Sequence, residues 1–215
     1  MDCGISALRV RFREKGPGGH WRHAPPFTEM ASVPSLPIHD MHERHPGLTE
    51  ATASSNSEAL RVCLDRHHHS PTDFDIDNDG QTISVEANWH PTDTQTRRAW
   101  ANEIVATEAG AYACVLAAFE LAEGLVAVER ADTGTGTDYY LSSAEDPDDL
   151  ESALRVEVSG LNAGSPTEIR SRLKQKVTQA AAGDSALPAL AGVVGFRERL
   201  ILLSRVQHFA EAPQD

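Results

Sequence analysis

Three carboxylate residues are candidates for one acidic site, provided that the two strands expected to carry Asp138 and Glu157 are neighbours. Glu108 falls at the centre of the apolar face of an expected helix, Asp138 opens an expected strand, and Glu157 lies mid-way along the next strand on its polar side. An isolated charge on a buried face is costly, so Glu108 needs a partner. Converging acidic side chains bind a divalent cation through charge and oxygen geometry. The alternative is structural: Glu108 pairs with Arg130 or Arg155, and Asp138 caps a loop.

A second acidic segment has the spacing of an EF-hand calcium loop. Gly80 falls at the position of the sharp turn, and the flanking sequence places acids at the oxygen-ligand positions. These acids are Asp75, Asp77, Asp79 and Glu86. An EF-hand needs a helix on each side, whereas Pro71 lies just before this segment and the residues through Trp89 alternate like a strand. The alternative is a polar turn in a β-hairpin.

Histidines form a third candidate for metal binding. His39, His42 and His45 recur at three-residue spacing, as do His20 and His23, and imidazoles so spaced share one face of a helix. Prolines bracket the first group, and neither group lies in a segment with a packing pattern. A solvated surface role is therefore the simpler interpretation.

The element that would hold Glu108 is the longest periodic segment. Residues 94–123 contain no proline, and Gly124 follows them. At about 100° per residue, several apolar side chains fall on one face, which predicts a single buried helix. They are Trp100, Ile104, Tyr112, Val115 and Phe119.

The remaining elements follow from alternation and capping signals. Residues 154–159 place Leu154, Val156 and Val158 on one side and polar residues on the other, as in a strand with one buried face. Ser165-Pro-Thr-Glu168 is a capping box that starts a helix, which Gly183 ends. A helix from Asn56 or Ser57, a hairpin over 74–89, strands at 125–129, 138–141 and 190–196, and a strand or short helix at 200–206 complete the expectation.

Domain boundaries follow from the same texture. Residues 1–57 carry six of the twelve prolines and no helical or alternating period, so we expect them to be disordered. Residues 58–207 form the single α/β domain, and residues 208–215 a flexible tail.

Composition bounds the class of protein. The 215 residues carry a net charge of −13, and residues 58–164 hold 21 acids against six bases. Bulk acidity argues against duplex DNA as a partner. Three scattered cysteines without a CxxC pair argue against a disulfide scaffold or a thiolate zinc site. No apolar run approaches the roughly 20 residues of a membrane span, and residues 1–15 have no export signal, so we expect a cytoplasmic protein without a membrane.

The order helix, strand, strand, strand, helix, strand from Thr94 onward resembles the αβββαβ core of the restriction-endonuclease-like, or PD-(D/E)xK, nuclease superfamily. In that superfamily a helix acid, an Asp on the second strand and a Glu-x-Lys on the third bind magnesium and activate water. The resemblance matches these to Glu108, Asp138 and Glu157. Ser159 stands where the lysine belongs, which implies a relocated lysine or a degenerate relative.

Lys176 is the better replacement, because it lies nearer the apolar stripe of the capped helix, and Lys174 is second. The phrases Gly134-Thr-Gly-Thr-Asp138-Tyr and Arg155-Val-Glu-Val-Ser-Gly160 also resemble a group of bacterial proteins without an assigned activity.

The resemblance implies a divalent-metal-dependent nuclease with Mg²⁺ or Mn²⁺ as cofactor, or a degenerate relative. The alternative is a non-catalytic protein-interaction module of a bacterial defence-type system, whose acidic surface meets a basic partner. Four basic residues of the capped helix offer a stripe for nucleic acid beside the acidic site. They are Arg170, Arg172, Lys174 and Lys176.

Overall fold

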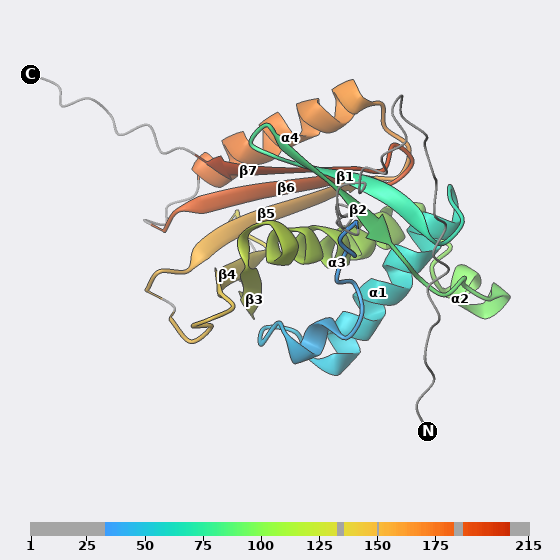
Figure 1. Cartoon of the computed structure of the whole chain (residues 1–215), viewed down its shortest axis with the longest axis horizontal. Coiled ribbons are helices and arrows are strands. Elements are labelled where there is room, and N and C mark those ends of the chain that lie inside the picture. The colour runs from blue at the N-terminus through green and yellow to red at the C-terminus, as the bar shows by residue number, and fades with distance from the viewer. Residues whose placement is uncertain (1–32, 133–135, 150, 183–186, 207–215) are drawn as a thin grey trace, which may run out of the picture. The chain divides into compact units, whose positions relative to one another are not determined.

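The protein is described by a computed structural model over residues 33–132, 136–149, 151–182 and 187–206. In these ranges seven strands form one mixed sheet and four α-helices pack with it, which confirms the predicted α/β class (Figure 1). The helices are α1 (Glu50–Asp65), α2 (Thr94–Ala99), α3 (Glu103–Glu123) and α4 (Pro166–Ala181), with a 3₁₀ turn η1 (Met41–Glu43). The strands are β1 (Thr72–Asn78), β2 (Gln81–Ala87), β3 (Leu125–Arg130), β4 (Tyr139–Ser143), β5 (Leu154–Leu161), β6 (Ala189–Gly195) and β7 (Leu200–Val206).

The sheet runs in the order β2-β1-β7-β6-β5-β4-β3. Strands β3, β4 and β5 form an antiparallel meander, and α4 connects β5 to its parallel neighbour β6. The predicted hairpin is β1–β2. Residues 200–206, for which the sequence allows a strand or a short helix, form strand β7. From α3 onward the elements therefore follow as helix, three strands, helix and two strands.

Helices cover both faces of the sheet. Helix α4 packs on β5, β6 and β7 from one side, while α3 lies on the other side with α1 packed against it (Figure 1). Because side chains alternate along a strand, Glu157 of β5 faces α4 and Gly160 faces α3. A Cβ on Gly160 would lie 2.8 Å from the Thr107 carbonyl oxygen of α3, which shows how closely this helix approaches β5.

The predicted single helix over residues 94–123 is wrong, because it is broken at Asn102. The Asn102 side chain accepts hydrogen bonds from the amides of Ile104 and Val105, so it starts α3 as an N-cap. Asn competes with the helical backbone through such bonds and favours caps over helix interiors.

The predicted buried face of this helix is wrong at its start. Ile104 is 78% exposed and Glu108 is also exposed, whereas every residue from Tyr112 to Phe119 is buried. The second half of α3 lies between the sheet and α1, and is buried all round, so its sequence carries little period there. Glu108 is therefore solvated, and the expected cost of burying its charge does not arise.

Helix α3 also corrects the expectation about apolar runs. Its 21 residues are long and apolar enough to cross a bilayer by length and composition. In the structure most of that apolar stretch is buried inside the domain.

The predicted disorder of residues 1–57 is wrong for residues 33–57. Helix α1 begins at Glu50, capped by the Thr49 hydroxyl, rather than at Asn56 or Ser57. Upstream, Leu36 and Ile38 are buried, and the Leu36 amide donates to the Glu86 carbonyl of β2. This extended segment buries apolar residues without a regular period, which is why periodicity did not reveal it. Residues 1–32 and 207–215 lie outside the described ranges.

Helix α4 forms as its capping box predicts. The Ser165 hydroxyl accepts from the Glu168 amide, and the Glu168 carboxylate accepts from the Ser165 amide. Ile169 is fully buried against the sheet, where a Cβ on Gly195 would lie 2.1 Å from its Cδ1. The cap and this contact fix the rotation of α4, and therefore the direction in which its polar residues point.

Candidate functional site

Asp138 lies directly before β4, where it completes the hydrogen bonding of β5. Pairing of β4 with β5 begins at Tyr139 and Val156, so the next outward amide of β5, that of Val158, has no strand partner on this side. The Asp138 carboxylate accepts from that amide through Oδ2 at 2.8 Å. Its other oxygen, Oδ1, accepts from the Tyr112 hydroxyl at 3.0 Å. Asp138 therefore caps the amide of a strand residue, Val158 of β5, and not a loop as the structural alternative supposed.

Tyr112 connects Asp138 to the helix acid. Its hydroxyl oxygen lies 3.0 Å from Asp138 Oδ1 and 3.4 Å from Glu108 Oε1. Burial, followed by the neighbouring Asp138 charge, raises the pKa of the Tyr112 hydroxyl, so it stays a proton donor at neutral pH. The Arg130 guanidinium lies 5.6 Å from the Tyr112 ring centre, a cation–π contact, and Tyr139 packs edge-on against the same ring.

The expected structural pairing of Glu108 with an arginine is not seen. Within the described ranges neither Arg130 nor Arg155 forms an ion pair with Glu108. Arg155 is buried on the α4 side of β5 and donates through Nε to the Leu187 carbonyl. Glu108 is instead solvated and reaches the Tyr112 hydroxyl.

Glu157 is the most buried carboxylate of the site. It lies in the middle of β5, on the strand face expected to be polar. Only 3% of its surface is exposed, because α4 covers that face. Its Oε2 lies 2.7 Å from the Lys176 ammonium, and its Oε1 accepts from the Gln179 amide at 3.1 Å. Burial raises the pKa of Glu157, the Lys176 hydrogen bond opposes that rise, and the Asp138 charge adds to it.

The structure separates the two lysines named as replacements for the missing strand lysine. Lys176 contacts Glu157, whereas Lys174 lines a separate hollow of about 260 Å³ together with Arg170 and Asp79. Two residues on a helix differ by about 200° in direction, so neighbouring lysines face opposite ways. Ser159, two residues after Glu157 on β5, borders the same cavity as Lys176.

An open cavity of about 560 Å³ joins these residues between α3, the end of β5 and α4. Its charged lining comprises four acids and two bases: Glu103, Glu108, Asp138, Glu168, Arg172 and Lys176. Glu157 does not line it, because Lys176 and Gln179 cover both of its oxygens. Across the described ranges no three His, Cys, Asp or Glu side chains gather into a group that could hold a metal. Glu108, Asp138 and Glu157 are therefore not a ready three-ligand site.

Comparison of the chain with protein-family models, curated proteins and solved structures found no significant match. Membership of the restriction-endonuclease-like superfamily therefore stays a prediction, and the site has to be judged on its own geometry.

The calcium-loop segment folds as the hairpin alternative. Asp79 and Gly80 occupy a two-residue turn with φ of 47° and 90°, and no helix flanks it. Its carboxylates serve separate contacts: Asp77 accepts from the Gly80 amide, Asp75 from the Ser84 hydroxyl, and Asp79 from the Ser204 hydroxyl and the Arg205 amide. Glu86 belongs to β2 and pairs in register with Asp73. An EF-hand loop is not formed.

The histidine cluster serves structure where it is described. His45 Nδ1 accepts from the Ala127 amide of edge strand β3, and His45 Nε2 lies 3.0 Å from Glu120 Oε2. This arrangement satisfies an edge strand that would otherwise present an open amide. His39 Nε2 contacts the Asn88 carbonyl. His20 and His23, like residues 133–135 of the glycine-threonine run, lie outside the described ranges.

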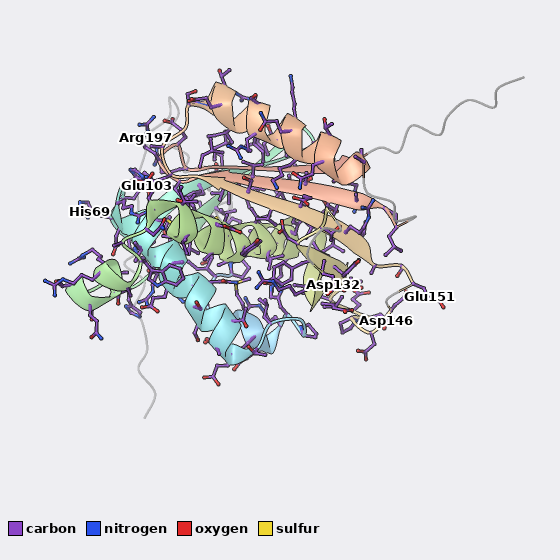
Figure 2. All side chains as sticks on the ribbon, turned by 180° about the vertical axis from the view of Figure 1, so that it is seen from behind. His69, Glu103, Asp132, Asp146, Glu151 and Arg197 are labelled. Carbon is purple, nitrogen blue, oxygen red and sulfur yellow. The ribbon has the colours of Figure 1, made fainter. Side chains whose placement is uncertain are left out.

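The basic residues of α4 do not form one stripe. Arg172 and Lys176 line the main cavity, while Arg170 and Lys174 line the smaller hollow beside the β1–β2 turn. The acidity is also divided. Figure 2 shows Asp146 and Glu151, which lie between β4 and β5, at the opposite end of the domain from Glu103, which borders the cavity.

Two residues at the site were not selected from the sequence. Tyr112 follows Glu108 by four positions and Gln179 follows Lys176 by three, so both lie on the helix face of a selected residue. That spacing was the available signal. Their roles depend on β5, which only the fold places between the two helices.

Proposed function

We propose that the domain is a divalent-metal-dependent phosphodiesterase of the nuclease type, related to the restriction-endonuclease-like superfamily, in which Asp138 and Glu157 hold the metal. The observation that carries the proposal is the Lys176 ammonium 2.7 Å from Glu157 Oε2, beside a cavity that Asp138 and Lys176 both line. It supplies from α4 the cation that the superfamily pattern carries at the position of Ser159 on β5.

The donor chemistry fits Mg²⁺ or Mn²⁺. Both residues offer hard carboxylate oxygens, and Mg²⁺ commonly takes one or two carboxylates and keeps several waters. The Lys176 ammonium beside Glu157 Oε2 shows that this oxygen has a cationic partner in the folded chain. When bound, the metal would lower the pKa of a water and stabilise negative charge on the phosphate.

The chain's own residues contribute orientation and charge. The Val158 amide and the Tyr112 hydroxyl fix the Asp138 carboxylate from two directions. Arg172 is an exposed cation on the cavity wall, where it can bind an anionic group of the substrate. Lys176 provides a second cation at the cavity. Glu108 helps to orient the Tyr112 hydroxyl that contacts Asp138.

The test is metal-dependent cleavage of single- and double-stranded DNA and RNA. Asp138→Asn and Glu157→Gln should each abolish cleavage with Mg²⁺ and Mn²⁺, since each removes a charged ligand. Asp146→Asn and Glu151→Gln are matched controls, because both residues are exposed between β4 and β5, away from the cavity. Equal cleavage by the site variants and the controls would exclude this assignment.

One observation favours a second candidate, a non-catalytic interaction module. All four carboxylate oxygens of Asp138 and Glu157 accept hydrogen bonds from the protein, as they would in a purely structural network. Calorimetry with Mg²⁺ and Mn²⁺ separates the two, because an interaction module should show no binding that depends on Asp138 and Glu157. Its acidic surface would then select a basic partner.

A further inference from the structure

The resting partner of Glu157 is a cation carried by the protein itself. Lys176 has 18% of its side chain exposed and Glu157 has 4%, so the pair is largely removed from water. A carboxylate this buried needs a counter-charge, and removal of one partner from such a pair is strongly unfavourable. Lys176 therefore stabilises ionised Glu157 in the absence of metal.

The same contact obstructs a metal. The oxygen that a divalent cation would use, Glu157 Oε2, already lies 2.7 Å from the ammonium, and Oε1 is taken by Gln179. A doubly charged ion beside that oxygen would repel the ammonium strongly in a partly desolvated site. Both cations cannot hold the present position, so one must leave.

The cavity offers a second position for the Lys176 ammonium. It already borders the cavity that Arg172 lines, and its four-carbon stem lets the ammonium swing by rotation of single bonds. Gln179 Oε1 lies 3.3 Å from the ammonium as an alternative acceptor. An ammonium displaced from Glu157 would join Arg172 on the cavity wall, where an anionic substrate group would be bound.

We propose that Lys176 is a built-in counter-ion that a divalent metal displaces from Glu157, so that metal binding itself delivers the ammonium into the cavity. The inference rests on the proposed metal ligands Asp138 and Glu157. A competing role and an orienting role predict opposite effects on metal affinity. If Lys176 competes with the metal, removal of Lys176 tightens metal binding. If Lys176 orients Glu157, removal of Lys176 weakens metal binding.

The experiment is calorimetric titration of the full chain with Mn²⁺ at about pH 8, where carboxylates are ionised. Lys176→Met should bind Mn²⁺ about tenfold more tightly than the wild type. Lys176→Gln, which keeps a hydrogen-bond donor beside Glu157, serves if the Met variant folds poorly. Lys174→Met is the matched control on the same helix and should bind as the wild type does. Thermal unfolding with and without Mn²⁺ gives a second readout of the same ranking.

The outcomes separate this inference from the proposed function. Weaker or unchanged Mn²⁺ affinity in both Lys176 variants overturns the counter-ion role, while Asp138-dependent binding by the wild type keeps the metal site. Binding by the Lys176 variants but not by the wild type supports the counter-ion role and removes the proposed function from the native chain. Absence of binding in every variant overturns both.

Discussion

Tyr112→Phe tests whether the Tyr112 hydroxyl positions the Asp138 carboxylate for the proposed metal binding. The substitution keeps the ring, which packs edge-on against Tyr139 at 5.5 Å and beneath Arg130 at 5.6 Å. It removes one hydroxyl, whose contacts are Asp138 at 3.0 Å and Glu108 at 3.4 Å. The change is therefore confined to the connection between the two acids.

The expected effect on stability is small. A hydrogen bond to a charged group is worth roughly 1.5–3 kcal/mol, and Asp138 borders an open cavity where water can replace the hydroxyl. We therefore expect a loss of about 1 kcal/mol in the free energy of unfolding, which lowers the melting temperature by roughly 2–4 °C for a domain of this size.

The expected effect on metal binding is larger. Asp138 is a proposed metal ligand, and its Tyr112 contact would orient it. Partners that orient a metal ligand typically change affinity by about 10- to 100-fold, and Tyr112→Phe removes this partner. Because burial and the Asp138 charge raise the pKa of Tyr112, the hydroxyl donates throughout the working range, so the difference should be constant from about pH 6 to about pH 9.

The assay pairs urea unfolding with Mn²⁺ calorimetry, and Tyr140→Phe is the control. Tyr140 is the neighbouring half-buried tyrosine, and it does not line the cavity. A Tyr112→Phe protein that loses about 1 kcal/mol of stability but binds Mn²⁺ like the wild type would refute the positioning role and leave the hydroxyl a structural contact.

Two further predictions concern the core. Burial raises the pKa of the Glu157 carboxyl above its ordinary value, so the folded state binds the carboxyl proton more tightly than the unfolded state does. The free energy of unfolding should therefore fall as pH rises through the window just above 4.5. Glu157→Gln should remove that fall in urea unfolding at a series of pH values, and a pH profile identical to the wild type would contradict the burial of an ionising group. Gly192→Ala places a Cβ 2.2 Å from Val115 Cγ1 and should cost about 1–3 kcal/mol. Val115→Ala in the same chain should recover part of that loss, and no recovery would mean that the strain lies elsewhere.

The part of the site on α4 could be predicted because a local signal fixes it. The capping box at Ser165 sets where the helix begins, and the apolar stripe sets which way it is rotated. Together they favour Lys176 over Lys174 before any tertiary contact is known. The alternation of β5 likewise places Glu157 on the face opposite Val156 and Val158, where it contacts Lys176 of α4, but the prediction of a single buried face is wrong because both faces are covered.

The part of the site on α3 could not be predicted in the same way. From Tyr112 to Phe119 this helix is buried on every side, so helical periodicity does not identify a single buried face. Ile104 and Glu108 are exposed against expectation, because only one side of the first two turns of α3, with Ala106 and Thr107, is buried. Local sequence can identify a capped amphipathic helix, but it cannot say how far a uniformly apolar helix is covered.

The origin of the cation beside Glu157 changes what the site can do. A lysine at position 159 would leave the same face of β5 two residues from Glu157, on a stem as flexible as that of Lys176. Lys176 reaches the carboxylate from another element, through a flexible stem, and contacts it directly. The chain therefore has a cation whose distance from Glu157 can change without movement of the backbone. Under the proposed function, this ion pair occupies Glu157 until a divalent cation competes for the carboxylate. Under the structural interpretation no cation displaces Lys176, so metal titration separates the two interpretations of Glu157.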